Sequence, residues 1–262
     1  MSFPLFTSML KRNRTIVLVS TLLLIFYILA VIGMFPSGMD IAEQMPKNLA
    51  RAYGVEEGIR DLGVFLGSGF YGISFVLFLI IYSVLTATRL VARLVDQGSM
   101  GYLLSTPASR TRVALTQACV LVFGLLLIVL LTFIAGLGGI YGIIENPDLN
   151  VIRFVQMSLV GFLLFFVVSS YSFLFSCLFN DEKRALAASG LLSVIFFLLN
   201  SLARMGQDLE WMQYLTPFTV FNPTEIAKGA ISVLPISIGL SVAGLLLYGL
   251  AVTIFRKRDL PL

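Results

Sequence analysis

Long apolar segments alternate with short polar segments along the whole chain. Six of them contain 18 or more residues and are predominantly apolar. A helix rises about 1.5 Å per residue, so about 20 apolar residues cross a hydrocarbon layer roughly 30 Å thick. The pattern therefore predicts an all-α polytopic membrane protein with six transmembrane helices, at residues 15–35, 62–88, 113–134, 154–179, 185–202 and 232–255.

The charged residues between these segments divide unequally between the two sides of the membrane. If both termini lie on one side, that side carries 12 basic and 4 acidic residues, and the other carries 6 basic and 10 acidic residues. Short loops rich in Lys and Arg stay in the cytoplasm. Both termini are therefore predicted to be cytoplasmic in a multi-pass protein of the cell membrane. The first apolar segment is longer than a signal-peptide core and is expected to remain as an uncleaved span.

Composition excludes several classes of function. The 262 residues are 58% hydrophobic and 12% charged, outside the usual range of a soluble domain. Histidine is absent, and Cys119 and Cys177 lie within apolar segments, so we expect no metal or cofactor on this chain. The net charge of +4 arises from basic clusters beside the spans and does not indicate nucleic-acid binding. No polar segment exceeds about 30 residues, so residues 1–262 are expected to form a single transmembrane domain.

The sequence shows no energy source of its own. It contains no G-x-x-x-x-G-K-[ST] loop for ATP, and no His or Lys inside a span that would activate a nucleophile, so we do not expect an enzyme. The centres of the six segments also lack the charged residues that ion-coupled carriers keep inside the membrane. This absence favours an external source of energy.

Neutral polar residues within the spans are candidates for lining a translocation path. Hydrogen bonding between helices is the alternative interpretation of such residues, and the sequence leaves it open. The candidates are Gln117, Ser169, Ser170 and Asn200.

The outer segments contain three features with structural consequences. Residues 211–223 are aromatic, uncharged and interrupted by two prolines, which suits an interfacial or re-entrant segment; a plain external loop is the alternative. Gly63 and Gly67 have the spacing that allows close approach of helices, although small residues also occur by chance. Four glycines between residues 136 and 142 are expected to loosen the outer end of the third span, and a short helix is expected at residues 46–53.

The polar stretch between the second and third spans carries four arginines and one acid. The helix of the second span is expected to continue through Arg89 and Arg93, which share a face, and Asp96 is placed to pair with Arg93. Gly98 and Gly101 are expected to end this helix and permit a sharp reversal. The stretch would thus fold back on itself in the cytoplasm.

After the reversal, residues 102–104 (Tyr-Leu-Leu) form a compact apolar knob. Ser105 or Thr106 is expected to cap a new helix with Pro107 at its first position, which leads into the third span. We call residues 89–112 the elbow. Because the elbow joins two spans, it is suited to transmit force from a docked partner; an ordinary inner loop is the alternative.

Residues 96–110, which read DQGSMGYLLSTPASR, resemble the acidic-x-G-x-x-x-x-L-L-x-x-P-x-S-R signature of permease subunits of type 2 ABC exporters. The resemblance implies a cytoplasmic coupling helix, seated in a groove of a separate ABC ATPase subunit that binds ATP and Mg. It also implies that two permeases, either copies or paralogues, work with two ATPases, and that an outer re-entrant segment precedes the sixth span. In one departure, Gly101 stands where the family often has a second acid.

The elbow and the resemblance together define a set of residues expected to contact the ATPase or to shape the elbow. They are Arg89, Arg93, Asp96, Gln97, Gly98, Tyr102, Leu103, Leu104, Thr106, Pro107, Ser109 and Arg110. The sequence thus predicts the permease subunit of an ATP-driven exporter for an amphipathic or hydrophobic substrate, such as a drug, antibiotic, peptide or lipid. The alternatives are a membrane anchor or sensor that recruits an ATPase without translocation, and a self-contained secondary carrier.

Overall fold

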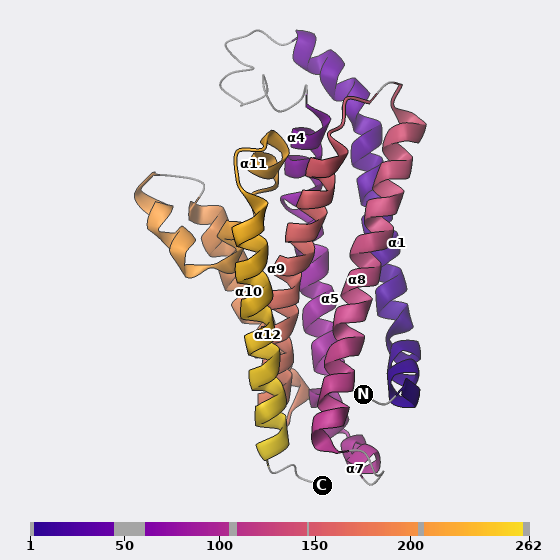
Figure 1. Cartoon of the computed structure of the whole chain (residues 1–262), viewed down its shortest axis with the longest axis vertical. Helices are drawn as coiled ribbons and strands as arrows, with labels where there is room; N and C mark the ends of the chain where they lie inside the picture. The colour runs from indigo at the N-terminus through magenta and orange to yellow at the C-terminus, as the bar shows by residue number, and fades with distance from the viewer. Residues whose placement is uncertain (1–2, 45–60, 105–108, 146, 204–206, 259–262) are drawn as a thin grey trace.

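The computed structural model describes residues 3–44, 61–104, 109–145, 147–203 and 207–258. Within these ranges the chain is a bundle of helices without strands (Figure 1). Six helices of the described chain are long and apolar enough to cross a membrane, which confirms the predicted fold class. They are α1 (Phe3–Gln44), α5 (Ser74–Leu90) with its continuation α6 (Ala92–Asp96), α8 (Arg110–Ile143), α9 (Val151–Leu178), α10 (Glu182–Ala203) and α12 (Val233–Lys257).

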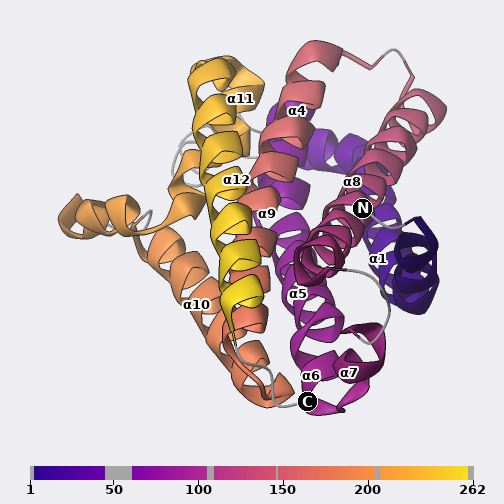
Figure 2. The same cartoon turned by 60° about the horizontal axis from the view of Figure 1, so that its bottom comes forward.

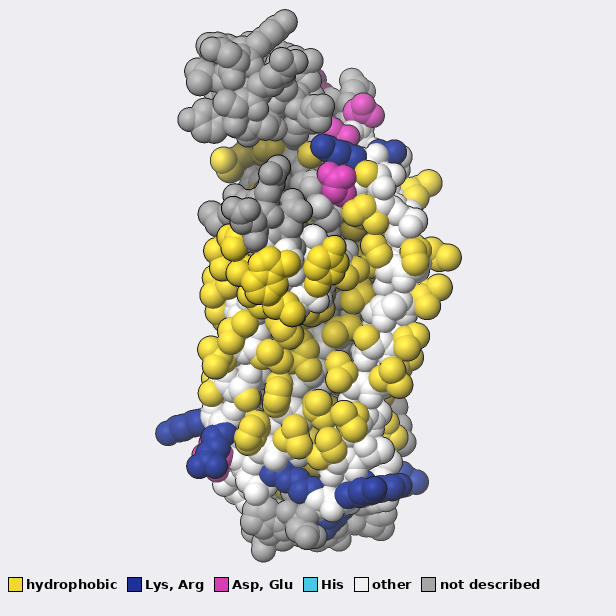
Figure 3. Space-filling view, turned by 90° about the vertical axis from the view of Figure 1, so that its left-hand side faces the viewer, with side chains coloured by type: hydrophobic (Ala, Val, Ile, Leu, Met, Phe, Trp, Pro, Cys, Tyr) yellow, Lys and Arg dark blue, Asp and Glu magenta, His cyan; other side chains and the backbone are white. Residues whose placement is uncertain are grey.

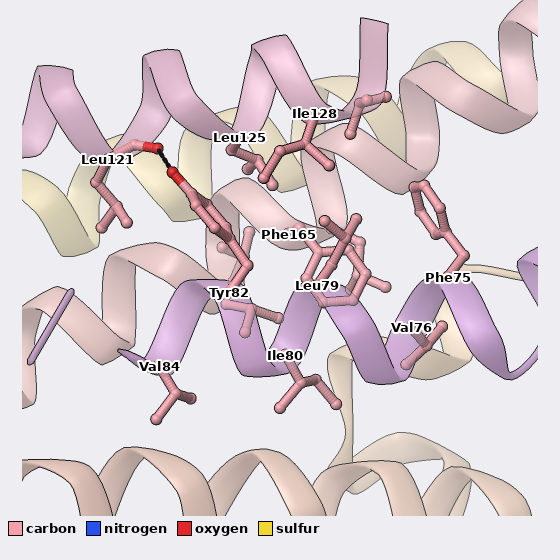
Figure 4. Close-up of a cluster of buried hydrophobic side chains, with 14 of the residues drawn as sticks. Phe75, Val76, Leu79, Ile80, Tyr82, Val84, Leu121, Leu125, Ile128 and Phe165 are labelled. Atoms are coloured by element: carbon pink, nitrogen blue, oxygen red, sulfur yellow. Dashed lines mark hydrogen bonds between the residues drawn. The ribbon is translucent and has the colours of Figure 1, made fainter. Parts of the chain in front are cut away.

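Helix α9 occupies the centre of the bundle and packs most extensively against α12, whereas α1 packs mainly against α8. The side chains of Phe75, Ile128 and Phe165 meet where α5, α8 and α9 adjoin, and each is at most 1% exposed (Figure 4). The Tyr82 hydroxyl donates a hydrogen bond of 2.9 Å to the Leu121 carbonyl oxygen in the same cluster. Because lipid is as apolar as these side chains, close packing and such bonds hold membrane helices together.

The second apolar segment is not one continuous helix, contrary to the prediction. A short helix α4 (Leu62–Leu66) leads into a π-helical turn η1 (Gly67–Tyr71), and the chain kinks at residues 72–73 before α5 begins. The carboxylate of Asp61 caps α4 by accepting hydrogen bonds of 2.7 and 3.2 Å from two backbone N–H groups of its first turn. Several glycines in this stretch weaken the α-helix, and π-turns and kinks occur at such places.

The outer end of α8 is also different from the prediction, because the helix continues to Ile143 through all of its glycines. A Cβ atom on Gly136 would lie 2.7 Å from the Ile28 side chain, and one on Gly139 would lie 2.4 Å from the Leu29 side chain. These glycines therefore let α1 approach α8 closely, and the tight packing keeps the helix intact.

The segment between α10 and α12 forms two 3-10 helices, η2 (Gln207–Leu215) and η3 (Pro217–Val220), followed by α11 (Pro223–Lys228). The Phe218 ring lies 6.2 Å from the Phe165 ring, measured between centroids. Phe165 is 14 residues into α9, about 21 Å along the helix axis. Part of this segment thus enters the bundle to a considerable depth, which favours the re-entrant interpretation over an external loop.

Helix α11 returns to the end of the bundle opposite α7 and packs on α4. A Cβ atom on Gly67 would lie 3.1 Å from the Pro223 carbonyl carbon, and one on Gly63 would lie 3.5 Å from the Ala227 Cβ atom. Arg153 Nη1 donates a hydrogen bond of 2.8 Å to the Ala227 carbonyl oxygen. The spacing of the two glycines therefore serves close approach. The short helix expected at residues 46–53 falls outside the described residues.

The start of α1, the end of α12 and the short helix α7 (Ser99–Leu104) lie at the same end of the bundle (Figures 1 and 2). On the face that Figure 3 shows, a broad hydrophobic band separates this end, which carries Lys and Arg side chains, from an opposite end that carries both signs of charge. A band of this kind is typical of a membrane-embedded surface. The end that carries α7 contains the candidate site.

Candidate functional site

Near the start of the elbow, Val91 has backbone angles of φ −125° and ψ −68° and interrupts the helix between α5 and α6. The expected uninterrupted helix through residues 89–93 is therefore wrong. The Ala92 N–H donates a hydrogen bond of 2.9 Å to the Ser176 hydroxyl of α9, and that hydroxyl donates one of 2.8 Å to the Ala87 carbonyl oxygen. A single buried serine thus satisfies two backbone groups beside the break, which would otherwise be costly to bury.

The reversal that follows α6 depends on Gly98. This residue has φ +67°, in the left-handed region that favours glycine, and its N–H donates a hydrogen bond of 2.9 Å to the Val95 carbonyl oxygen. Gly101 was also expected to end the helix, but it lies within α7, and its N–H donates to the Gly98 carbonyl oxygen at 3.2 Å. One left-handed residue is sufficient for the turn, so Gly101 has helical geometry.

The first end of the elbow contacts the start of α10. Arg93 Nε lies 3.8 Å from Glu182 Oε2, and the two side chains are 37% and 30% exposed. The Asp96 carboxylate accepts a hydrogen bond of 3.4 Å from the N–H of Glu182, the first residue of α10. The negative charge of Asp96 therefore lies at the N-terminus of α10, where it is favoured. The partner of Arg93 in the structure is therefore Glu182, in place of the pairing with Asp96 expected from sequence spacing.

The second end of the elbow contacts the end of α12. The Ser109 hydroxyl caps α8 by accepting a hydrogen bond of 3.3 Å from the Arg112 N–H. The next residue, Arg110, donates from Nη1 to the Arg258 carbonyl oxygen at 2.8 Å. The helix of the third span thus begins at Arg110 and not at Pro107 as expected, because Ser109 is extended and caps it. Residues 105–108, which include the expected cap, fall outside the described residues.

The guanidinium of Arg258 in turn binds the end of α9. It donates hydrogen bonds to the carbonyl oxygens of Cys177 and Phe179, the latter at 3.3 Å, and to the side-chain oxygen of Asn180. Burial lowers the pKa of Arg258, but an arginine stays protonated at neutral pH. Both ends of the elbow are thereby attached to residues 177–182, which we call the α9–α10 turn.

A comparison with known protein families matches residues 6–256 to a family described as the C-terminal domain of the multidrug efflux system permease Rv1217c. The chain belongs to this family of efflux permeases. It is a multi-pass protein of the cell membrane, as its six apolar helices require. A comparison of this chain with curated proteins finds no match.

The elbow residues predicted from the sequence occupy three kinds of place in the efflux permease. Arg93, Asp96 and Arg110 contact the α10 and α12 ends, while Gln97 is exposed and Arg89 is partly buried. Gly98 and Ser109 shape the turn and the helix cap. Tyr102, Leu103 and Leu104 form the last turn of α7, and Thr106 and Pro107 lie outside the described residues.

The four candidate pathway residues of the permease differ in their surroundings. The Ser169 hydroxyl is hydrogen bonded to the Tyr248 hydroxyl of α12 at 2.8 Å, and Ser170 donates to a carbonyl of its own helix at 2.7 Å. Asn200 lines a small pocket that includes Phe218 of η3. Gln117 is fully buried, and neither amide atom has a hydrogen-bond partner among the described residues. Gln117 therefore has a buried polar group without a partner in the described part of the bundle.

Two residues of the site were not predicted from the sequence. Glu182 and Arg258 appeared there only as charges in an inner turn and in a basic terminal cluster. In the permease they connect the elbow to the ends of α9, α10 and α12. Only one feature of the sequence could have indicated that these two residues belong to the site. Both lie beside the ends of spans, on the same predicted side of the membrane as the elbow.

The left-handed turn of the permease can be tested at Gly98. We expect Gly98→Val to lower substrate efflux about tenfold, because a side chain at positive φ costs about 1–2 kcal/mol. Among the described residues, no atom lies within 4 Å of the position where a Cβ would be, so the expected loss comes from backbone strain. Gly98→Asn is the matched control, since Asn tolerates this conformation, and efflux should stay within about twofold of wild type. Equal efflux in the two variants would contradict the role of the turn.

Proposed function

We propose that this efflux permease is the transmembrane subunit of an ATP-driven ABC exporter, and that a separate ATPase subunit docks on α7. The attachment of both ends of the elbow carries the proposal. Arg93 and Asp96 connect it to α10, and Arg110 connects it to Arg258 and so to α9 and α12. An element attached in this way transmits a push to several spans at once.

The proposed orientation places α7 and both ends of the chain in the cytoplasm. The excess of basic residues at this end supports it, because such residues are retained on the cytoplasmic side. The ATPase subunit binds ATP and Mg, so this chain needs no cofactor and performs no hydrolysis. ATP-driven approach of two ATPases moves the paired elbows and tilts the spans connected to them.

A second permease, either a copy or a paralogue, completes the proposed unit. Helix α10 is the least buried of the six described spans, and its buried residues are Ala185, Ser189 and Ser193. Its exposed apolar side chains are therefore available to lipid or to another permease, and we assign them to the second permease. They include Leu186, Leu191, Val194, Ile195, Leu198 and Leu202. The family description also makes the matched unit one domain of a larger permease in Rv1217c.

The proposed substrate is an amphipathic or hydrophobic compound, of the class of drugs, antibiotics, peptides or lipids, and it moves outward. The family description as a multidrug efflux permease supports this class. The path would run along largely apolar walls in which Gln117 offers a free amide when the helices separate. Such a group adds a hydrogen bond to a mainly apolar site, which is the usual composition of a small-molecule pocket.

The test is reconstitution of the permease in vesicles together with a candidate ABC ATPase subunit from the same organism. We expect a fluorescent amphipathic drug to be transported only when both proteins and ATP are present. An ATPase that binds the permease without any transport would favour the anchor or sensor. Transport by the permease alone, driven by an ion gradient, would instead favour the secondary carrier.

A further inference from the structure

Three consecutive basic residues end α12, and their surroundings differ. Arg256 and Lys257 are exposed, whereas Arg258 is partly buried against the end of α9. Topology requires only that positive charges lie at this end, and any of the three satisfies that requirement. The additional contacts of Arg258 therefore point to a further role.

Arg258 occupies a place where several elements end. Its guanidinium donates to the carbonyl oxygens of Cys177 and Phe179 and to Asn180, while its own carbonyl oxygen accepts from Arg110. Carbonyl oxygens at the end of a helix lack partners within that helix and carry partial negative charge, so a cation there is stabilised. The planar guanidinium can donate hydrogen bonds to several oxygens at once, whereas the ammonium of a lysine on its flexible side chain does so less well.

We propose that Arg258 is a positioning residue of the transport cycle, which passes movement of the elbow to α9 and α12. This inference rests on the proposed function, because it requires an ATPase that moves the elbow. A shift of Arg110 pulls on the Arg258 carbonyl, and the guanidinium of the same residue holds the end of α9. The elbow and the two helices then move as one body.

The contacts of Arg258 involve only the end of the elbow that contains Arg110. Arg93 and Asp96 contact α10 through Glu182, and neither of these contacts involves α12. Loss of the Arg258 guanidinium should therefore leave α10 attached to the elbow and remove the hydrogen bonds that connect the last turn of α9 to the residue that accepts from Arg110. The packing of α9 on α12 remains, but the end of α9 follows the elbow less closely. ATP hydrolysis then continues with less movement of this end, and hydrolysis and transport become uncoupled.

The experiment compares Arg258→Gln, Arg258→Lys and the neighbouring control Arg256→Gln in vesicles that contain the permease and its ATPase. Three quantities are measured: co-purified ATPase, ATP hydrolysis, and drug transported per ATP hydrolysed. We expect Arg258→Gln to lower transport per ATP about tenfold with co-purification retained, Arg258→Lys to give an intermediate value, and Arg256→Gln to match wild type.

Two results would overturn the inference. The first is equal transport per ATP in Arg258→Gln and Arg256→Gln. The second is a parallel loss of co-purification, hydrolysis and transport in Arg258→Gln, which would indicate a purely structural role. Failure of the wild-type permease to bind or depend on the ATPase is a separate outcome, which contradicts the proposed function itself. Labelling of the buried Cys177 thiol in a Cys119→Ser background adds a local readout, because release of the α9 end in Arg258→Gln should increase it.

Discussion

Replacing Leu103 and Leu104 together with Asp is expected to weaken binding of the ATPase about 1,000-fold. The two leucines form part of α7, and in the proposed complex their side chains enter an apolar groove. Loss of an interface anchor costs about 2 kcal/mol or more, so two anchors cost about 4 kcal/mol. Burial of unpaired carboxylates adds to this cost. The measurement is the amount of ATPase that co-purifies with the permease, together with drug efflux from cells.

The matched control is Phe3→Asp. Phe3 is apolar, 74% exposed and located at the same end of the bundle, so this variant introduces the same chemical change away from α7. We expect Phe3→Asp to keep the ATPase bound, and both variants to insert into the membrane in normal amounts. Undiminished co-purification by the double variant would show that the ATPase does not dock on α7.

The spans of this permease could be predicted from sequence because the membrane imposes a simple requirement. A helix that crosses lipid needs about 20 apolar residues, whatever its neighbours are. The break at Val91 and the kink at residues 72–73 could not be predicted in the same way. The Val91 break has a partner from a distant part of the chain, the Ser176 hydroxyl. The π-helical turn before the kink packs against α11, which lies about 150 residues further along the chain.

Prediction of the site was limited for the same reason. The turn at Gly98 is a local property of the backbone, and glycine is the residue that favours it, so the sequence indicated it correctly. Arg93 and Asp96 have a spacing that suits a mutual pair, yet Glu182 approaches from a helix that begins 86 residues after Asp96. Arg258 lies 148 residues from Arg110 and looked like one of several topological charges. Long-range approach of this kind leaves no periodic signal.

The largest structural effect is expected from Gly67→Leu, which tests the packing of α11 on the break of the second span. A Cβ atom there would lie 3.1 and 3.2 Å from the carbonyl carbon and oxygen of Pro223. These are backbone atoms, so α11 itself has to move. Overpacking of this kind costs about 3 kcal/mol, which lowers the melting temperature of the purified permease by about 5–10 °C.

Gly138→Leu provides the control, because Gly138 is exposed on α8 and no atom of the described residues lies within 4 Å of a Cβ at that position. Leucine also forms helix better than glycine, so this variant should melt at the same temperature as wild type or slightly above it. The two substitutions are chemically identical and differ only in what the new side chain meets. Equal melting temperatures would mean that α11 does not pack on Gly67, and the re-entrant segment would then lose its anchor at the end of the bundle opposite α7.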